Sequence, residues 1–360
     1  MNQIRRKVLV APFDWGLGHA TRSIPIIREL QRRDCEVLIA SSGDALVLLK
    51  KEFPSIQSFE LPSYRATYSR YFPLIFKVFF QLPKFLVVIA KEHHAIERIV
   101  KQQQVHFLIS DNRYGCWTKL VPTVFITHQI NIQMPFALQW IQAIVNFFNH
   151  RQIRKFNHCW IPDFPENRLT GKLTEPGNVS VKFIGMLSRF NKVNTDVAPA
   201  YDYLALVSGP EPQRTIFERK VRLCFSEVEG RKIVVRGLPG LVEEIVSLGD
   251  LDEVSHLTAD ELQRIIEQSR LVICRSGYSS IMDVAALGKR ALLIPTPGQT
   301  EQEYLGAELM KMEKALSVKQ DSFSGNDLLR AEGYTGFLNG FSMDLLKKEI
   351  DAILRQCIVK

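Results

Sequence analysis

LVICRSGYSSIMDVAALGKRALLIPTPGQTEQEYLGA, residues Leu271 to Ala307, is the stretch that decides the fold. It predicts a buried strand over 271–274, a polar turn, a helix that ends at Gly288, a second strand over 291–295 and a glycine-containing loop before another helix. A strand that leads through a glycine turn into a helix binds phosphate well, because free backbone N–H groups and the positive end of the helix dipole face the anion. Asp283 lies inside that helix, where a carboxylate commonly accepts hydrogen bonds from ribose hydroxyls.

Outward from this stretch, strand and helix patterns alternate twice along the chain. Near-continuous apolar strands separated by amphipathic helices indicate an α/β fold with parallel sheets covered on both faces. The predicted strands span 7–11, 35–40, 56–61, 107–110 and 123–126 in the first half, and 203–208, 232–236, 271–274 and 291–295 in the second. We therefore expect two Rossmann-like domains that face each other across a cleft. The expected boundaries are 1–187, a polar linker at 188–201, a second domain at 202–340 and a C-terminal helix at 341–360 that crosses back to the first domain.

Composition indicates an ordinary soluble enzyme of two domains. The chain has 360 residues, 46% of them hydrophobic, which is enough for two cores. Its six cysteines are far apart and form no C-x-x-C pair, which is typical of reduced, buried thiols in a cytosolic protein. The apolar run after the basic start is too short for a signal peptide, so we interpret it as the first strand. We expect a cytoplasmic protein, with the inner face of the plasma membrane as the place of any peripheral contact.

Positive charge is concentrated in the first part of the chain. Residues 1–163 carry 21 Lys and Arg against 11 Asp and Glu, whereas the remainder carries 25 against 27. Two apolar, aromatic segments lie there, Tyr68 to Ala90 and Ile130 to Phe156, and both are interrupted or followed by basic residues. Apolar surface rimmed by Lys and Arg suits docking on an anionic membrane face. The alternative is that both segments are core helices of a Phe-rich domain with a solvated basic edge.

The first glycine loop, Phe13 to Arg22, follows the first predicted strand. Gly16 and Gly18 let the backbone approach a ligand, and His19 and Arg22 are three residues apart, hence on one face of the opening helix. The loop fails as G-x-G-x-x-G because Thr21 stands at the third glycine, which disfavours a dinucleotide-binding dehydrogenase. His19 is a candidate general base or a donor to a diphosphate; alternatively, it only caps the turn.

Three further polar loops follow predicted strands. Asp111 follows the strand at 107–110 and is the alternative base, while His128 follows the strand at 123–126 and is suited to orient an acceptor hydroxyl. Both side chains would serve equally to fix their loops through backbone hydrogen bonds. In the second half, Ser208 and Arg214 flank a Pro-rich loop and are candidates to reach a phosphate.

These motifs together resemble the GT-B glycosyltransferases of family 28, which include the peptidoglycan lipid-linked N-acetylglucosaminyltransferase and the plastid galactolipid synthases. The similarity runs through nearly the whole chain, and the C-R-S-G block that ends at Gly277 is its most specific part. It implies the GT-B fold, with a donor diphosphate on the turn formed by Arg275, Ser276 and Gly277. It also implies a ribose bound by Asp283, a donor sugar bound by Gln302 and Glu303, a uracil on the loop at His256 and Leu257, and a G-x-x-x-R linker that ends at Arg189.

Some positions depart from the family pattern. Asp283 stands where Glu is usual, Glu303 replaces the second Gln of a Gln-Gln pair, and the loop at His128 lacks an acidic residue between His and Gln. The first loop also resembles that of nucleotide-sugar hydrolases with the same fold, in which the histidine activates water. A hydrolase or epimerase that uses His19 is therefore the alternative enzyme, and a non-enzymatic nucleotide-sugar binder is a third hypothesis.

The reaction implied is an inverting, metal-independent transfer of a hexose or N-acetylhexosamine from a nucleotide sugar, with UDP as the expected carrier. The acceptor would be lipid-linked or a cell-envelope glycan. His19 or Asp111 would take the acceptor proton, while Arg275, Ser276, Ser208, Arg189 and the helix dipole stabilise the departing diphosphate. We expect no cofactor and no metal, because Asp250 and Asp252 form the only D-x-D and stand in a turn that we expect to be exposed. Nucleic-acid binding is disfavoured because no recognised module is present.

Overall fold

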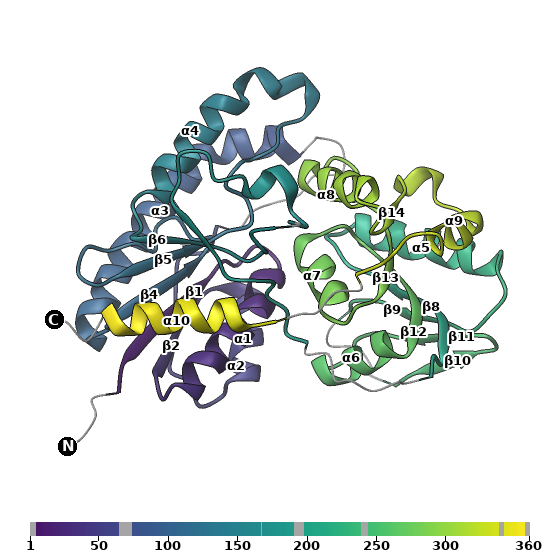
Figure 1. The fold of residues 1–360 in the computed structure, drawn as a ribbon, viewed down its shortest axis with the longest axis horizontal. Helices are drawn as coiled ribbons and strands as arrows, with labels where there is room; N and C mark the ends of the chain where they lie inside the picture. The colour runs from purple at the N-terminus through teal and green to yellow at the C-terminus, as the bar shows by residue number, and fades with distance from the viewer. Residues whose placement is uncertain are drawn as a thin grey trace. The chain divides into compact units, whose positions relative to one another are not determined.

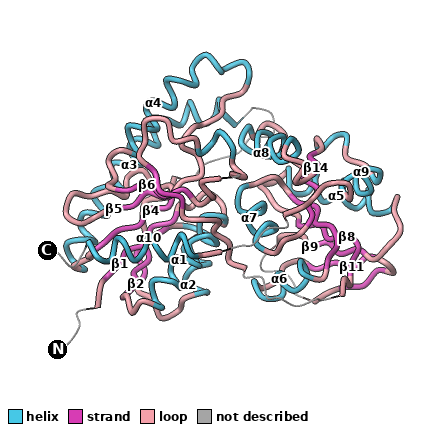
Figure 2. The backbone as a smooth tube through the Cα atoms, viewed as in Figure 1, coloured by secondary structure: helices cyan, strands magenta, loops and turns pink. Residues whose placement is uncertain are grey.

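The computed structural model describes residues 5–64, 74–166, 168–190, 198–238, 244–337 and 342–356, with side chains from Pro83 onward in the helix that starts at Leu74. The chain forms two compact units. Residues 1–187 and 342–360 make the first domain, and residues 188–341 make the second. Each has its own sheet, and Figure 2 shows strands and helices alternating along both.

The first domain is built on a sheet of seven parallel strands in the order β3-β2-β1-β4-β5-β6-β7. Its central strands are apolar and fully buried, as expected for a parallel sheet covered on both faces. The strands are β1 (Lys7–Pro12), β2 (Glu36–Ser41), β3 (Ser58–Glu60), β4 (Phe107–Asp111), β5 (Thr123–Ile126), β6 (His158–Ile161) and β7 (Val181–Phe183).

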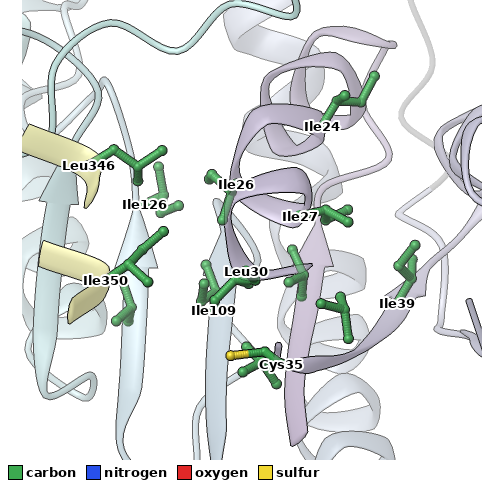
Figure 3. Close-up of a cluster of buried hydrophobic side chains, with 14 of the residues drawn as sticks. Ile24, Ile26, Ile27, Leu30, Cys35, Ile39, Ile109, Ile126, Leu346 and Ile350 are labelled. Carbon is green, nitrogen blue, oxygen red and sulfur yellow. The ribbon is translucent and has the colours of Figure 1, made fainter. Parts of the chain in front are cut away.

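Helices cover this sheet, and the last helix of the chain is one of them (Figure 1). In α10, Leu346 and Ile350 join the core that Ile26 and Leu30 of α1 form over β1, β4 and β5 (Figure 3). The apolar residues of α10 recur at helical spacing, which explains why one face is buried and the other is charged. The helices are α1 (Gly18–Arg32), α2 (Gly43–Glu52), α3 (Leu74–Gln103), η1 (Phe136–Ile141), α4 (Gln142–Ile153), η2 (Gly171–Thr174) and α10 (Asp344–Gln356).

The second domain repeats the plan with the strand order β10-β11-β9-β8-β12-β13-β14, in which β10 alone is antiparallel to its neighbour. Its strands are β8 (Tyr201–Leu206), β9 (Lys232–Val235), β10 (Val246–Leu248), β11 (Leu251–Val254), β12 (Ser269–Cys274), β13 (Arg290–Leu293) and β14 (Leu316–Ser317). Its helices are α5 (Gln213–Ser226), α6 (Ala259–Glu267), α7 (Tyr278–Ala286), α8 (Thr300–Lys311), η3 (Gln320–Ser322) and α9 (Gly325–Ala331).

Every strand predicted from an apolar run is present, and five short ones were missed. The prediction omitted β6, β7, β10, β11 and β14, each two to four residues long. Asp250 and Asp252 were expected in an exposed turn, but Asp252 is buried in β11, where the Tyr201 hydroxyl and Arg231 donate to its carboxylate. The strand β8 begins at Tyr201, inside the predicted linker, of which residues 191–197 lie outside the described part of the chain.

Candidate functional site

In the first domain, three neighbouring strands bring the predicted polar residues together. Strand β1 lies between β2 and β4, so the strand order reverses there, and open α/β sheets bind ligands at such a point. His19 and Arg22 follow β1 in the first turns of α1, Asp111 ends β4, and His128 follows β5. The register pairs Pro12 with Asp111 and Asp111 with Ile126, which places all three loops at one edge of the sheet.

Arg22 is the centre of this cluster, and its guanidinium contacts all three other side chains. Its Nε donates to Asp111 Oδ2 at 2.7 Å, and its Nη2 donates to Asp111 Oδ1. Its Nη1 lies 2.7 Å from His128 Nδ1, and its Nη2 lies 2.9 Å from His19 Nδ1. His19 Nδ1 is also 3.1 Å from Asp111 Oδ1. The sequence predicted these four residues singly; their arrangement around one guanidinium depends on the strand order.

Asp111 and His19 differ in burial and in the direction of their charge effects. Asp111 is 0% exposed, whereas His19 is 13% exposed. Burial opposes ionisation of Asp111, but Arg22 and then His19 outweigh it and hold the pKa of that carboxyl well below its usual range. Burial, followed by the charge of Arg22, lowers the pKa of His19. At neutral pH the cluster therefore holds one carboxylate, one guanidinium and a neutral His19.

The loop geometry around His19 is partly glycine-dependent. Gly16 has a φ of 79°, in the left-handed region that other residues rarely adopt, and Gly18 is the first residue of α1. The ring of Phe13 meets the His19 ring edge-on, with centroids 5.4 Å apart. These contacts fix the imidazole between an aromatic ring and the charged pair.

A second buried arginine supports the first loop, and the sequence analysis missed its role. Arg113 is fully buried, ion-paired with Glu92 of α3, and its Nε donates to the Pro12 carbonyl at 2.9 Å. It also donates to the Ser42 hydroxyl, which in turn donates to Asp14 of the first loop. No spacing rule links Glu92 to Arg113, so only the tertiary structure reveals this support.

In the second domain, the predicted phosphate loop follows β12, next to β8 and β13. Helix α7 starts after Gly277 without a side-chain cap in the described residues, so the loop presents uncapped helix N–H groups. The Arg275 side chain, however, turns inward. It donates to the carbonyls of Ile294, Pro295 and Gln213 and to Gln320 Oε1, and it stacks on the Phe217 ring.

The prediction that the turn formed by Arg275, Ser276 and Gly277 binds the diphosphate stays a prediction, and the structure shows that the Arg275 guanidinium is bound by oxygens of the protein itself. Its partners are carbonyl and amide oxygens, and no described carboxylate pairs with it. Burial lowers the pKa of Arg275 to about 10, so the group is charged at neutral pH. The predicted phosphate loop therefore contains a buried positive charge that no carboxylate of the described residues neutralises.

Ser276, Gly277, Gln302 and Glu303 lie close together around this loop. Ser276 Oγ donates to the Gln302 carbonyl at 2.7 Å, and Gln302 Oε1 accepts from the Thr296 N–H at 2.8 Å. Glu303 Oε1 accepts from the Gly298 N–H at 3.0 Å. The structure thus places both predicted sugar-binding residues at the turn that follows β13.

Asp283 lies in α7 beside the first residues of this domain. Ser188 Oγ donates to its Oδ1 at 2.6 Å, and Arg189 Nε is 3.5 Å from its Oδ2. Burial raises the pKa of Asp283, although Arg189 and Ser188 oppose that shift. Two predicted donor residues, Asp283 and Arg189, are therefore in contact.

The loop after β8 contains two residues that were predicted to contact a phosphate, Ser208 and Arg214. Ser208 follows β8, the strand that pairs with β12, so it lies at the same sheet edge as Ser276. Arg214, expected to reach a phosphate, instead donates to Glu211, Glu218 and the Arg236 carbonyl. Two carboxylates therefore neutralise the Arg214 guanidinium, and its contact with a phosphate stays a prediction.

An exposed apolar surface covers η1 and α4 of the first domain. We call it the aromatic surface and define it by Phe136 (89% exposed), Trp140 (76%), Ile144 (55%), Phe147 (60%) and Phe148 (57%). Three exposed basic residues, Arg151, Arg154 and Lys155, follow at the end of α4. Core packing, the alternative interpretation, is therefore wrong for these five side chains. Of the segment 68–90, residues 68–73 lie outside the described residues.

Neither a membrane-spanning helix nor a metal cluster is found in the part of the chain that the structure describes. No described helix is both long and apolar enough to cross a bilayer. Among the described side chains, no group of three or more His, Cys, Asp or Glu is arranged to hold a metal ion.

Comparisons with known sequences match part of the second domain to a known family. Residues 248–332 match the model of the glycosyltransferase family 28 C-terminal domain. The UDP-N-acetylglucosamine--N-acetylmuramyl-(pentapeptide) pyrophosphoryl-undecaprenol N-acetylglucosamine transferase of Glaesserella parasuis is 34% identical over 73 residues, which are 20% of this chain and 21% of that protein. The Haemophilus influenzae enzyme of the same name is 25% identical over 134 residues, 31% of this chain and 38% of its own. The matched segments thus span well under half of these relatives.

Solved structures match over almost the whole chain at low identity. MurG of Acinetobacter baumannii has a TM-score of 0.61 at 14% identity and covers 97% of this chain and 99% of its own. The calicheamicin glycosyltransferase CalG4 has a TM-score of 0.65 at 11% identity, covering 99% and 100%. The spinosyn rhamnosyltransferase SpnG, solved with thymidine diphosphate, has a TM-score of 0.63 at 14% identity, covering 97% and 96%. The protein has the GT-B fold, and residues 248–332 of its second domain match the glycosyltransferase family 28 C-terminal domain.

Proposed function

We propose that this protein is an inverting glycosyltransferase that moves a sugar from a nucleotide diphosphate, with UDP as the expected carrier, to a lipid-linked acceptor at a membrane. The observation that carries the proposal is the pairing of a family 28 donor domain with a buried Arg–Asp–His cluster in the other GT-B domain. A GT-B fold alone would not identify the reaction, since function resides in the site.

The proposed binding of the donor diphosphate rests on the buried positive charge of Arg275. A buried guanidinium without a counter-ion is costly, and an anion bound on the loop above Arg275 would offset that cost. The N–H groups at the start of α7 supply hydrogen-bond donors to the same anion. Arg275 would then act through its field and by holding the loop, while Ser276 and Ser208 lie at the edge where the diphosphate leaves.

The proposed binding of the nucleoside depends on Asp283. Its carboxylate accepts from Ser188 and faces Arg189, which shows that it is held for hydrogen bonding rather than buried in an apolar contact. A ribose hydroxyl would replace one of these donors. Gln302 and Glu303, both on the neighbouring turn, are the proposed contacts to the donor sugar.

On the acceptor side, the structure favours His19 over Asp111 as the base. Asp111 is fully buried and both of its oxygens accept from Arg22, so an acceptor hydroxyl has no route to it. His19 is partly exposed and has a lowered pKa, which keeps the imidazole neutral and able to take a proton. Attack by the activated hydroxyl on the anomeric carbon, with loss of the nucleotide diphosphate, inverts that centre.

The aromatic surface is the proposed membrane contact. Five large apolar side chains on one short helical segment are costly in water, and the basic residues at the end of α4 match anionic headgroups. A sedimentation assay with vesicles of phosphatidylglycerol and phosphatidylcholine tests this. The double variant Phe147→Ser, Phe148→Ser should lose at least about tenfold in binding, because burial of one Phe contributes roughly 1.5–3 kcal/mol. Leu223→Ser, an exposed leucine of the second domain, is the matched control.

Release of UDP from a panel of UDP-sugars, with and without a membrane-lipid extract, tests the whole proposal. We expect release that requires the lipid and that deposits labelled sugar in the lipid phase. Release at the same rate in plain buffer would contradict the transferase and point to the hydrolase. Binding of UDP without any turnover would point to the non-enzymatic binder.

A further inference from the structure

Helix α4 has its polar and apolar faces reversed relative to an ordinary surface helix, which packs its apolar face inward. Gln142, Asn146 and Asn149 are spaced four and three residues apart, so they lie on one face, and that face is turned toward the protein. The opposite face carries side chains of the aromatic surface. All 12 residues of α4 are described, and only Asn149 and Ile153 among them are buried.

Two of the inward side chains accept hydrogen bonds from the backbone of the 129–134 loop, which follows β5. Asn146 Oδ1 accepts from the Ile132 N–H at 2.8 Å, and Gln142 Oε1 accepts from the Met134 N–H at 3.0 Å. A backbone N–H can only donate, so the oxygen of each amide faces the loop. Side chains of α4 thus supply the acceptors that a strand or a helix would otherwise provide for these two N–H groups.

Asn149 binds the carbonyl groups of the same loop, beside the cluster around Arg22. Its Nδ2 donates to the carbonyls of Gln129 and Ile130 at 3.2 and 2.8 Å. Gln129 directly follows His128, whose Nδ1 lies 2.7 Å from Arg22 Nη1. The position of His128 in the cluster is therefore linked through the backbone to α4.

The outer face of α4 determines how firmly this arrangement is held. Ile153 is the one buried apolar side chain of the helix, and structure with few buried apolar contacts opens at a low free-energy cost. An opened segment would not present the aromatic surface on one face, so a bilayer binds the closed form in preference. The exposed residues Arg151, Arg154 and Lys155 at the end of α4 favour an anionic bilayer.

We propose that Gln142, Asn146 and Asn149 are positioning residues that couple docking of the aromatic surface on an anionic bilayer to the order of the 129–134 loop. This inference rests on the membrane contact in the proposed function. A bilayer covers the outer face of α4, and the three inward amides then hold the loop closed. The protein thereby completes the loop beside His128 at the surface where a lipid-linked acceptor is found.

Hydrogen exchange of the full-length protein, read by mass spectrometry at single residues, tests the coupling without any need for turnover. Vesicles of phosphatidylglycerol and phosphatidylcholine are added at about ten times their Kd, so mass action should slow exchange at Ile132 and Met134 about tenfold. Thr296 and Gly298 of the second domain, whose N–H groups also bind side-chain oxygens, are the control amides and should not change. Vesicle binding without slower exchange at Ile132 and Met134 would overturn the proposal.

Variants of α4 identify the side chains that carry the coupling. Asn146→Ala removes the acceptor for the Ile132 N–H, so vesicles should no longer slow exchange there, while the slowing at Met134 persists. Asn146→Asp keeps an acceptor oxygen and should restore the slowing at Ile132. Phe147→Ser, Phe148→Ser should abolish it at both amides. Slowing at Ile132 that persists in Asn146→Ala would refute the role of Asn146.

Lipid-dependent release of UDP separates the coupling from the proposed reaction. Asn146→Ala should raise the KM for the lipid acceptor about three- to tenfold, the order of one hydrogen bond, and leave the KM for the UDP-sugar unchanged. Asn146→Asp should restore the acceptor KM. A wild type with the expected exchange but no turnover would refute only the proposed reaction. A wild type that does not sediment with the vesicles would overturn both the membrane contact and the coupling.

Discussion

Arg22 and Arg275 are buried arginines at the carboxyl edges of two similar sheets, yet their surroundings differ. Arg22 is ion-paired with Asp111, so the charge of its cluster is balanced inside the protein. Arg275 donates only to neutral oxygens and has no described carboxylate partner. This difference fits our proposal that the first domain supplies the base and the second domain binds the anionic donor.

The largest effect is expected at His19. His19→Gln should lower kcat about 10²- to 10⁴-fold, the usual contribution of a general base, and leave the affinity for UDP unchanged. Steady-state kinetics and calorimetric titration measure the two quantities. His94→Gln, an exposed histidine of α3, is the control. A comparable loss of UDP affinity would mean that His19 belongs to the donor site.

Asp111→Asn tests whether the carboxylate of Asp111 neutralises the buried charge of Arg22. The change leaves Arg22 as an unpaired buried charge, so we expect a loss of about 3–5 kcal/mol in the free energy of unfolding at pH 7. Because the folded-state pKa of Asp111 is depressed, its contribution is fully present above about pH 4 and is lost as the pH falls further. Urea unfolding at pH 7 and pH 3 measures this. A difference between wild type and variant that is equal at both pH values would contradict the charge account.

A smaller effect is expected at Asp283. Asp283→Asn should weaken binding of UDP by about ten- to hundredfold, in line with one hydrogen bond to a charged group. Binding of the 2′,3′-dideoxy analogue should change little, since it lacks the hydroxyls that the carboxylate would accept from. Calorimetry with both ligands measures the ratio. Equal losses for the two would place Asp283 in a purely structural role toward Ser188 and Arg189.

Much of the fold was predictable from the residues, and the site was predictable in part. The run TVFI predicted β5 to the residue, because four consecutive residues of high strand propensity are bounded by polar loops. The strand β14 has only two residues, Leu316 and Ser317, and carries no periodicity to detect. His19 and Arg22 were placed on one helix face by their spacing. Their contact with Asp111 and His128 depends on the order of β1, β4 and β5, which spacing does not encode.

The orientation of side chains was the hardest feature to predict. Arg275 occurs in a turn typical of phosphate binding, and the sequence did not indicate where its guanidinium points. The structure turns it onto Phe217 and the carbonyl groups that follow β13. Glu211 and Glu218, by contrast, stand three residues before and four residues after Arg214, so helical spacing could have indicated these ion pairs, but the prediction did not use it.

The most direct test of the contrast is the affinity ratio of UDP to uridine, measured by calorimetry in the wild type, Arg275→Gln and Arg22→Gln. If the second domain binds the diphosphate, the preference for UDP over uridine should fall about tenfold or more in Arg275→Gln and persist in Arg22→Gln. A preference that persists in Arg275→Gln, or that disappears in Arg22→Gln, would contradict the assignment of donor binding to one domain and proton transfer to the other.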